Sequence, residues 1–240
     1  MYEERSYRGM TSPRDLVCYE IQHKETDLFC CTKTDLSGYI KERVFFYRHQ
    51  LEEYIHMKPI FKDSLAPVEN DPVAPHIVRE MIEASSLLNI GPMATVAGAI
   101  AEFVGRDIMD LSDVFIIENG GDIYLKTDRE RVIQIYAKDS SFSEKIGIRL
   151  KPSSSPYGIC TSSATVGPSL SFGNADAVSI VGTSALFADG LATSLGNIVK
   201  KKDDIPIAIE KGRQFAGVIG ILIVLGENLG IWGDIDIAKI

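Results

Sequence analysis

The sequence has no long apolar run, no excess of positive charge and no cysteine pair at the spacing of a zinc site. No stretch approaches the ~20 apolar residues that a membrane-spanning helix needs, and the longest candidate, residues 216–225, has the Ile and Val content of a strand. The formal net charge of -8 argues against nucleic acid or an anionic membrane as the main partner, because both favour a basic face. We therefore expect the partner to be a small-molecule ligand or another protein.

The four cysteines are Cys18, Cys30, Cys31 and Cys160. Without a C-x-x-C spacing they indicate neither a zinc ribbon nor a secreted disulfide framework, so we interpret them as reduced thiols with packing roles. Cys30 and Cys31 are adjacent in an expected strand, so their side chains should point to opposite faces. Residues 1–5 lack the apolar core of a signal peptide, which favours a cytoplasmic protein.

The apolar patterning predicts a fold in which strands cluster with strands and helices with helices. With 240 residues, 45% of them hydrophobic, the chain can bury a substantial core, and we expect a single domain over residues 1–240 made of two intimately packed halves. Helical periodicity covers residues 37–55, 76–88, 94–105 and 184–199, and strand-like runs cover residues 16–21, 27–33, 114–117, 123–125, 132–137, 146–150, 177–181, 218–225 and 234–240. This order predicts an α+β fold, with helices on one face of an antiparallel sheet.

A glycine pair lies between two of these apolar runs, in the segment Glu118, Asn119, Gly120, Gly121 and Asp122. Two glycines permit positive φ and let a bound group approach the backbone, while the flanking side chains offer oxygen atoms. The same residues are ordinary chemistry for a tight hairpin turn. Residue types alone favour the plain turn over a ligand site.

Hydroxyl groups are dense in residues 158–167, which contain Thr161, Ser162 and Ser163. Hydroxyls and backbone amides suit a phosphate or a nucleotide, although a Ser/Thr-rich loop without a G-x-x-x-x-G-K pattern is an equal alternative. Cys160 is a candidate nucleophile, but no activating base is identifiable and an inert thiol is the better interpretation.

Asp189 and Thr193 are four residues apart on an expected helix and so share one face. One carboxylate beside a hydroxyl is a credible partial Mg²⁺ site, because Mg²⁺ is completed by waters and ligand phosphates. The alternative is a single carboxylate on a solvated helix face. Asp176 is a second candidate carboxylate, and the basic run 200–202 indicates a solvated helix end.

Taken in order, these segments resemble ApbE, the magnesium-dependent FAD:protein FMN transferase. The matching segments are residues 97–102, AGAIAE, residues 119–123, NGGDI, residues 161–163, TSS, and residues 188–193, ADGLAT. A closer resemblance covers nearly the whole chain. It is to a branch of ApbE-like prokaryotic proteins of unestablished function, marked by G-P-M-A-x-V-A-G-A-I-A-E, E-N-G-G-D-I and C-T-S-S.

The resemblance implies a T-fold-like architecture of antiparallel sheets with packed helices, and a site between the halves. It places a flavin nucleotide at residues 119–122 and Mg²⁺ at Asp189, with Thr193 nearby. FAD or another nucleotide-like molecule is the expected ligand. With the hydroxyl segment included, the candidate ligand-binding residues are Asn119, Gly120, Gly121, Asp122, Thr161, Ser162 and Ser163.

The chain also departs from the family pattern. ApbE has a lysine where this sequence has Glu102. The H-x-x-D-P segment of ApbE is missing from the shorter stretch 164–176. Within the closer branch, Ala164 and Pro168 depart from the motif S-S-G-T-V-G-H-S. A glutamate beside a pyrophosphate-type group would weaken its binding if that glutamate were desolvated and unpaired. We therefore predict a retained small-molecule pocket without FMN transfer as the ordinary reaction, and we assign no catalytic residue.

Two alternatives stay open at this point. One is a non-catalytic binding module that has kept the pocket and lost the reacting groups. The other is an oligomeric structural protein that uses its glycine-alanine-rich helix or its Ile-rich C-terminal strand as an interface between copies.

Overall fold

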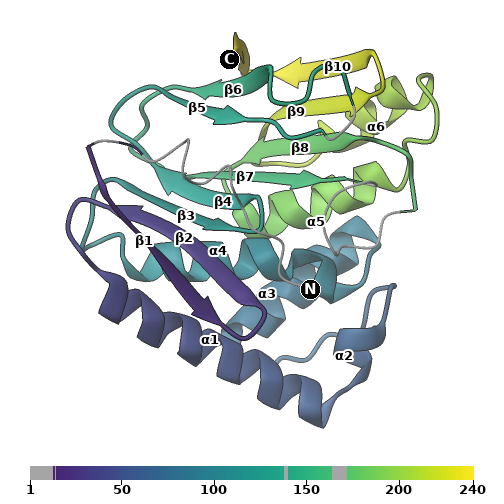
Figure 1. The fold of residues 1–240 in the computed structure, drawn as a ribbon. Coiled ribbons are helices and arrows are strands. Elements are labelled where there is room, and N and C mark those ends of the chain that lie inside the picture. The colour runs from purple at the N-terminus through teal and green to yellow at the C-terminus, as the bar shows by residue number, and fades with distance from the viewer. Residues whose placement is uncertain (1–12, 14, 138–139, 164–171) are drawn as a thin grey trace.

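A large antiparallel sheet forms the centre of the fold in the computed structural model, which describes residues 13, 15–137, 140–163 and 172–240 (Figure 1). Its strand order is β1-β2-β3-β4-β7-β8-β9-β10, and every neighbouring pair is antiparallel. The strands are β1 (Val17–His23), β2 (Thr26–Thr32), β3 (Phe115–Asn119), β4 (Asp122–Lys126), β7 (Tyr157–Ser162), β8 (Ala177–Gly182), β9 (Val218–Leu225) and β10 (Asn228–Gly233). The predicted α+β class with antiparallel pairing is confirmed. Ala164, Pro168 and residues 1–5 lie outside the described residues.

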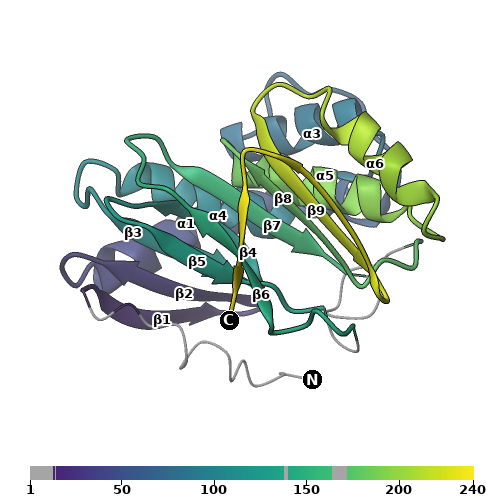
Figure 2. The same ribbon diagram turned by 90° about the horizontal axis from the view of Figure 1, so that it is seen from above.

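The helices cover one face of this sheet, and a small second sheet covers part of the other (Figure 2). The helices are α1 (Ser37–Met57), α2 (Ile60–Asp63), α3 (His76–Leu88), α4 (Val96–Asp107), α5 (Ala185–Gly196) and α6 (Asp204–Gly212), with a 3₁₀ turn, η2 (Pro92–Thr95), before α4. The small sheet has the order β11-β6-β5, formed by β5 (Arg131–Gln134), β6 (Ile146–Leu150) and β11 (Asp236–Lys239). Because side chains alternate between the two faces of the large sheet, its strands contribute residues to two apolar cores, one on each face.

Local sequence signals explain why the central helices begin and end where they do. Pro75 precedes α3, and Asn89 ends it in the left-handed conformation with φ 55°. Ser184 is the N-cap of α5, where its hydroxyl accepts a hydrogen bond from the Phe187 N–H. The N-cap at Ser184 sets where α5 begins, and the first residue of α5, Ala185, lies directly against Gly98 of α4.

Four elements differ from the sequence predictions, and one of them is β10, which lies between the expected strands 218–225 and 234–240. The hydroxyl-rich segment is not a loop at its start, because Tyr157–Ser162 forms β7 in the middle of the large sheet, between β4 and β8. The short helix α2 interrupts the proline-rich stretch before α3, and α6 follows α5. In α6, Ile205, Ala208 and Gly212 are buried while Ile207 is exposed, so the apolar stripe is too short to stand out in the sequence.

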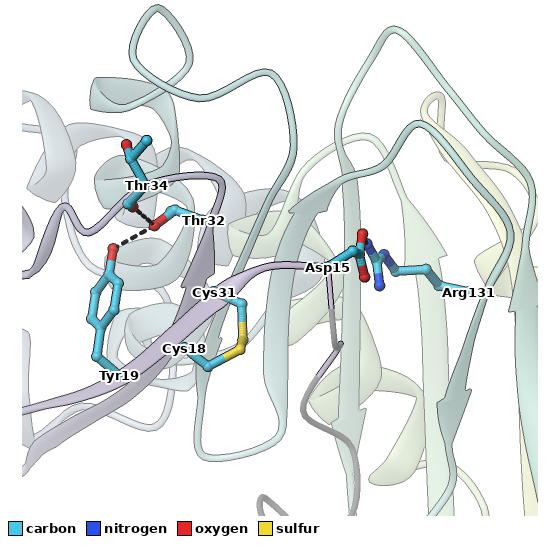
Figure 3. Close-up of a disulfide and its surroundings, with 7 residues drawn as sticks. All are labelled: Asp15, Cys18, Tyr19, Cys31, Thr32, Thr34 and Arg131. Carbon is cyan, nitrogen blue, oxygen red and sulfur yellow. Dashed lines mark hydrogen bonds and ion pairs between the residues drawn. A yellow bond between two sulfur atoms is a disulfide. The ribbon is translucent and has the colours of Figure 1, made fainter.

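The prediction of four reduced thiols is wrong for two of them, because Cys18 and Cys31 form a disulfide between β1 and β2 (Figure 3). The physical reason is register. A hairpin that pairs His23 with Thr26 places Cys18 directly opposite Cys31, although 13 residues separate them in the chain. The prediction that Cys30 and Cys31 face opposite sides is consistent with this arrangement, since Cys30 packs in the helix-side core.

Within the described part of the chain, no single helix is both long enough and apolar enough to cross a membrane. Among the described residues, α3 and the segment Pro92–Asp107 are long and apolar enough only when taken together, and they are bent by 104° relative to each other.

Candidate functional site

The glycine pair forms the two-residue turn between β3 and β4. Gly120 has φ 69° and Gly121 has φ 99°, the left-handed values that a two-residue hairpin turn requires. The Gly121 N–H donates to Glu118 Oε1 at 2.7 Å, so the carboxylate of Glu118 fixes the turn. A Cβ added at Gly121 would meet nothing within 4 Å, which leaves the backbone here open to approach.

The first turn of α4 lies between this hairpin and α5. Asn119 Nδ2 donates to the Ala97 carbonyl at 3.1 Å, and the Gly98 N–H donates to Asp189 Oδ2 at 2.9 Å. A Cβ at Gly98 would lie 2.3 Å from the Ala185 carbonyl oxygen, so the absence of a side chain at this position lets α4 pack closely against α5. This packing brings the ADGLAT segment of α5 to the NGGD turn.

The contact between these segments encloses two carboxyl groups, Asp122 on β4 and Asp189 on α5, which we call the carboxyl pair. Asp122 is only 8% exposed, and its Oδ1 has no hydrogen-bond partner among the described residues. Burial raises the pKa of Asp122 well above its ordinary value, and the negative charge of Asp189 raises it further. Part of Asp189 reaches solvent, yet burial of its carboxyl raises its pKa to about 7, against the lowering effect of the Gly98 and Ala97 N–H groups.

Cys160 on β7 lies beside the carboxyl pair and is fully buried. Its thiol donates to the Ala185 carbonyl at 3.2 Å. Burial raises the pKa of this thiol, and the negative charges of Asp122 and Asp189 raise it further. Because the thiolate is the nucleophilic form, this environment makes Cys160 inert at neutral pH.

The three hydroxyl residues that the sequence singled out do not gather at one point. The hydroxyl of Thr161 shares a hydrogen bond of 2.8 Å with that of Ser179 on β8. The Thr161 side chain lies on the sheet face opposite Cys160, so only the backbone N–H of Thr161 reaches the carboxyl pair. Ser162 points to the helix side, where its Oγ would lie 3.7 Å from a Cβ at Gly196. Ser163 follows the strand and is 8% exposed.

Glu102 has a different environment from the one that its position in the motif implies. It is 2% exposed, and its Oε2 accepts hydrogen bonds from Ser184 Oγ at 2.7 Å and from the Leu186 N–H at 2.9 Å, at the N-terminus of α5. Arg106 Nη2 donates to Glu102 Oε1 at 2.6 Å and also binds Glu80. Glu102 is therefore desolvated but paired, so the predicted loss of binding through an unpaired charge does not apply.

The donor set of the carboxyl pair fits a hard divalent cation only in part. No group of three or more His, Cys, Asp or Glu side chains that could hold a metal ion occurs among the described residues. Two carboxyl groups nevertheless match the small protein contribution that Mg²⁺ uses when waters and ligand phosphates complete its shell. Thr193 lies one helical turn beyond Asp189 on α5 and is half-buried.

The remaining candidate groups lie elsewhere. Asp176 accepts a hydrogen bond from the Gly226 N–H at 2.6 Å, in the turn between β9 and β10. The backbone N–H groups of Lys200 and Lys201 donate to Asp204 near the start of α6. A hollow of about 240 Å³ opens at the beginning of α5, but neither member of the carboxyl pair lines it.

Sequence reasoning missed the partners of Glu102 and the backbone groups of α4. A signal for the first was present, because Glu102 and Arg106 have the i,i+4 spacing of a helical ion pair and Ser184 precedes an apolar helix as an N-cap does. The backbone hydrogen bonds of Ala97 and Gly98 had no such signal, since they depend on how two distant helices pack.

Proteins similar in sequence cover most of this chain. A UPF0280 protein of Methanocaldococcus jannaschii is 41% identical over 220 residues, covering 88% of each chain. A UPF0280 protein of Methanosarcina acetivorans is 39% identical over 197 residues, covering 81% of this chain and 78% of the relative.

Solved structures of ApbE proteins share the fold. The Pseudomonas stutzeri flavinyl transferase ApbE, in its apo form, has a TM-score of 0.60 at 13% identity and covers 90% of this chain and 93% of its own. The ApbE protein of Thermotoga maritima has a TM-score of 0.58 at 14% identity, with coverages of 90% and 96%. A family model described as "AbpE bacteria" matches residues 9–216, and the chain therefore belongs to this family, within the ApbE-like superfamily.

Proposed function

We propose that this protein binds a flavin- or nucleotide-like small molecule together with Mg²⁺ at the carboxyl pair, within one domain over residues 1–240. The observation that carries the proposal is Asp122 Oδ1, which is buried beside a second carboxyl and has no hydrogen-bond partner among the described residues. Buried polar groups are normally paired, and each exception calls for an explanation. A divalent cation would neutralise the pair and supply the missing partner.

The surrounding residues support a phosphate-bearing ligand. Mg²⁺ held by one or two carboxylates normally completes its shell with waters and phosphate oxygens. Asp122 and Asp189 would hold the ion, and Thr193 is the candidate hydroxyl ligand. A Cβ at Gly121 would meet no protein atom within 4 Å, so this turn is the candidate wall for the ligand.

The flavin component rests on similarity in fold. The structural neighbour from Pseudomonas stutzeri is named a flavinyl transferase, which supports a flavin as the first ligand to test. The ordered match of the AGAIAE, NGGDI, TSS and ADGLAT segments supports the same place for it.

A non-catalytic binding module is the second candidate function, and one observation favours it. The thiol of Cys160 is held in its protonated form by burial and by two neighbouring carboxyl groups. The described site therefore offers no activated nucleophile, and we do not propose FMN transfer as the ordinary reaction.

Isothermal titration calorimetry of chelator-stripped protein tests this proposal. We expect saturable binding of FAD or ADP that requires MgCl₂, with loss of binding in Asp189→Asn. The matched control is Asp203→Asn, because Asp203 is an exposed carboxylate at the start of α6 and should leave binding unchanged. No binding of Mg²⁺, FAD or ADP by the wild type, or equal binding by Asp189→Asn, would contradict the proposal. Binding of FAD without turnover to a flavinylated protein would favour the binding module.

A further inference from the structure

The disulfide fastens an edge strand of the large sheet. Cys18 lies on β1, which is the first strand in the sheet order and pairs with β2 on one side (Figure 1). Cys31 lies directly opposite on β2, and β2 is paired with β3 on its other side. A covalent bond at this position therefore joins the edge strand to the body of the sheet.

The two sulfur-bearing residues differ in their access to solvent. Cys31 is fully buried, whereas Cys18 is half-buried. The other two cysteines, Cys30 and Cys160, are fully buried in the helix-side core, while Cys31, as the next residue along β2, faces the opposite side of the sheet. Because only Cys18 is partly exposed, we expect a reagent in solution to approach the disulfide from the Cys18 side.

The hairpin end of β1 is held independently of the disulfide. Lys24, in the turn between β1 and β2, pairs with Glu52 on α1. The ring of His23 packs edge-on against Phe45 of α1, with ring centroids 5.5 Å apart. These contacts hold the last residues of β1 against α1 whatever the state of the cysteines.

The N-terminal end of β1 has weaker ties (Figure 3). Tyr19 OH shares a hydrogen bond of 2.7 Å with Thr32 Oγ1, and Asp15, just before the strand, pairs with Arg131 of β5 at 2.9 Å. A hydrogen bond and a partly exposed ion pair each contribute about 1 kcal/mol or less. Beyond the backbone pairing of Val17, Cys18 and Tyr19 with β2, the disulfide is therefore the strongest side-chain tie at this end of the strand.

We propose that Cys18 and Cys31 form a reversible redox site, and that its reduction by a small dithiol releases residues 17–19 of β1 from β2. A thiolate of the dithiol attacks Cys18 Sγ, the S–S bond breaks, and the Cys31 sulfur leaves with the electron pair and takes a proton. The second thiol of the reagent then displaces Cys18, which also takes a proton. The dithiol ends as a disulfide and the protein as two thiols; a small-molecule disulfide reverses both steps.

Hydrogen exchange measured with and without dithiothreitol tests the release on the full chain. We expect exchange at residues 17–19 to become about 100-fold faster on reduction, which corresponds to about 3 kcal/mol for opening a closed loop of this length. Residues 21–23 should change much less, because Lys24 and His23 still hold them. In a Cys18→Ser, Cys31→Ser double variant, dithiothreitol should change nothing.

Single variants test the difference in access. With oxidised glutathione, Cys31→Ser should acquire a glutathione adduct on Cys18, while Cys18→Ser should leave Cys31 unmodified, both read by mass spectrometry of the intact protein. The proposal is overturned if the wild type treated with oxidised glutathione keeps four alkylatable thiols, if Cys31 is modified as fast as Cys18, or if reduction leaves exchange at residues 17–19 unchanged. The wild-type measurements need no variant to fold, and the proposal does not depend on ligand binding at the carboxyl pair.

Discussion

Replacing Asp189 with asparagine should stabilise the metal-free protein at neutral and alkaline pH. The pKa of Asp189 is raised from 3.8 to about 7 in the folded state, so the folded protein holds a proton that the unfolded chain has lost at intermediate pH. The free energy of unfolding contributed by this group therefore falls as pH rises from about 4 to about 7. A shift of about 3 pH units at about 1.4 kcal/mol each gives at most about 4 kcal/mol.

Urea unfolding in the presence of a chelator, followed by circular dichroism at pH 4, 6 and 8, measures this effect. The difference between Asp189→Asn and wild type reports Asp189 together with the part of the Asp122 shift that the Asp189 charge causes, because the more distant titrating residues contribute equally to both proteins. We expect a small difference at pH 4 that grows in favour of the variant to pH 8. The exposed control Asp203→Asn should stay within about 0.5 kcal/mol of wild type at each pH. A difference that is independent of pH, or that favours the wild type at pH 8, would refute the reasoning.

Substitutions at two further positions, Gly98 and Glu102, test the packing that builds the site. Gly98→Ala should lower the free energy of unfolding by about 1–3 kcal/mol, because its Cβ would lie 2.3 Å from the Ala185 carbonyl oxygen. The control Gly38→Ala should be neutral or stabilising, because nothing lies within 4 Å of its Cβ. Equal thermal midpoints for these two variants would contradict the prediction. Glu102→Lys should destabilise the fold by about 3–5 kcal/mol, since it puts a cation at the N-terminus of α5, whereas Glu102→Gln should cost about 1–3 kcal/mol; thermal unfolding of both variants checks the order.

Sequence periodicity predicted the elements whose burial repeats along one face. Helix α3 is found where it was expected, because an apolar stripe is bounded by Pro75 and by Asn89 in the left-handed conformation. Strand β7 was missed because hydroxyl residues are dense in it, and the hydroxyl of Thr161 is satisfied across the sheet by Ser179 of β8. That pairing is a property of the sheet order, which local sequence does not contain.

The site, like the fold, could be predicted from the sequence only in part. The order of the motifs predicted that residues 119–122 and Asp189 belong together, and α4 brings them to the same place through hydrogen bonds from Asn119 and to Asp189. The pairing of Glu102 with the N-terminus of α5 could not be predicted from the motif, since it depends on the approach of two helices. The disulfide likewise depends on the register of the hairpin rather than on the spacing of its cysteines.

The central claim is that the carboxyl pair is a divalent-cation site, and proton release on Mg²⁺ binding tests it most directly. Burial raises the pKa values of Asp122 and Asp189, and the charge of Asp189 raises that of Asp122 further, so a cation that binds their ionised forms must expel protons. Calorimetric titration of MgCl₂ at pH 6.5, in two buffers of different ionisation enthalpy, counts them. The account predicts that about one to two protons leave for each ion bound, and that Asp189→Asn abolishes the release. Mg²⁺ binding without proton release, or the same release from Asp189→Asn, would contradict it.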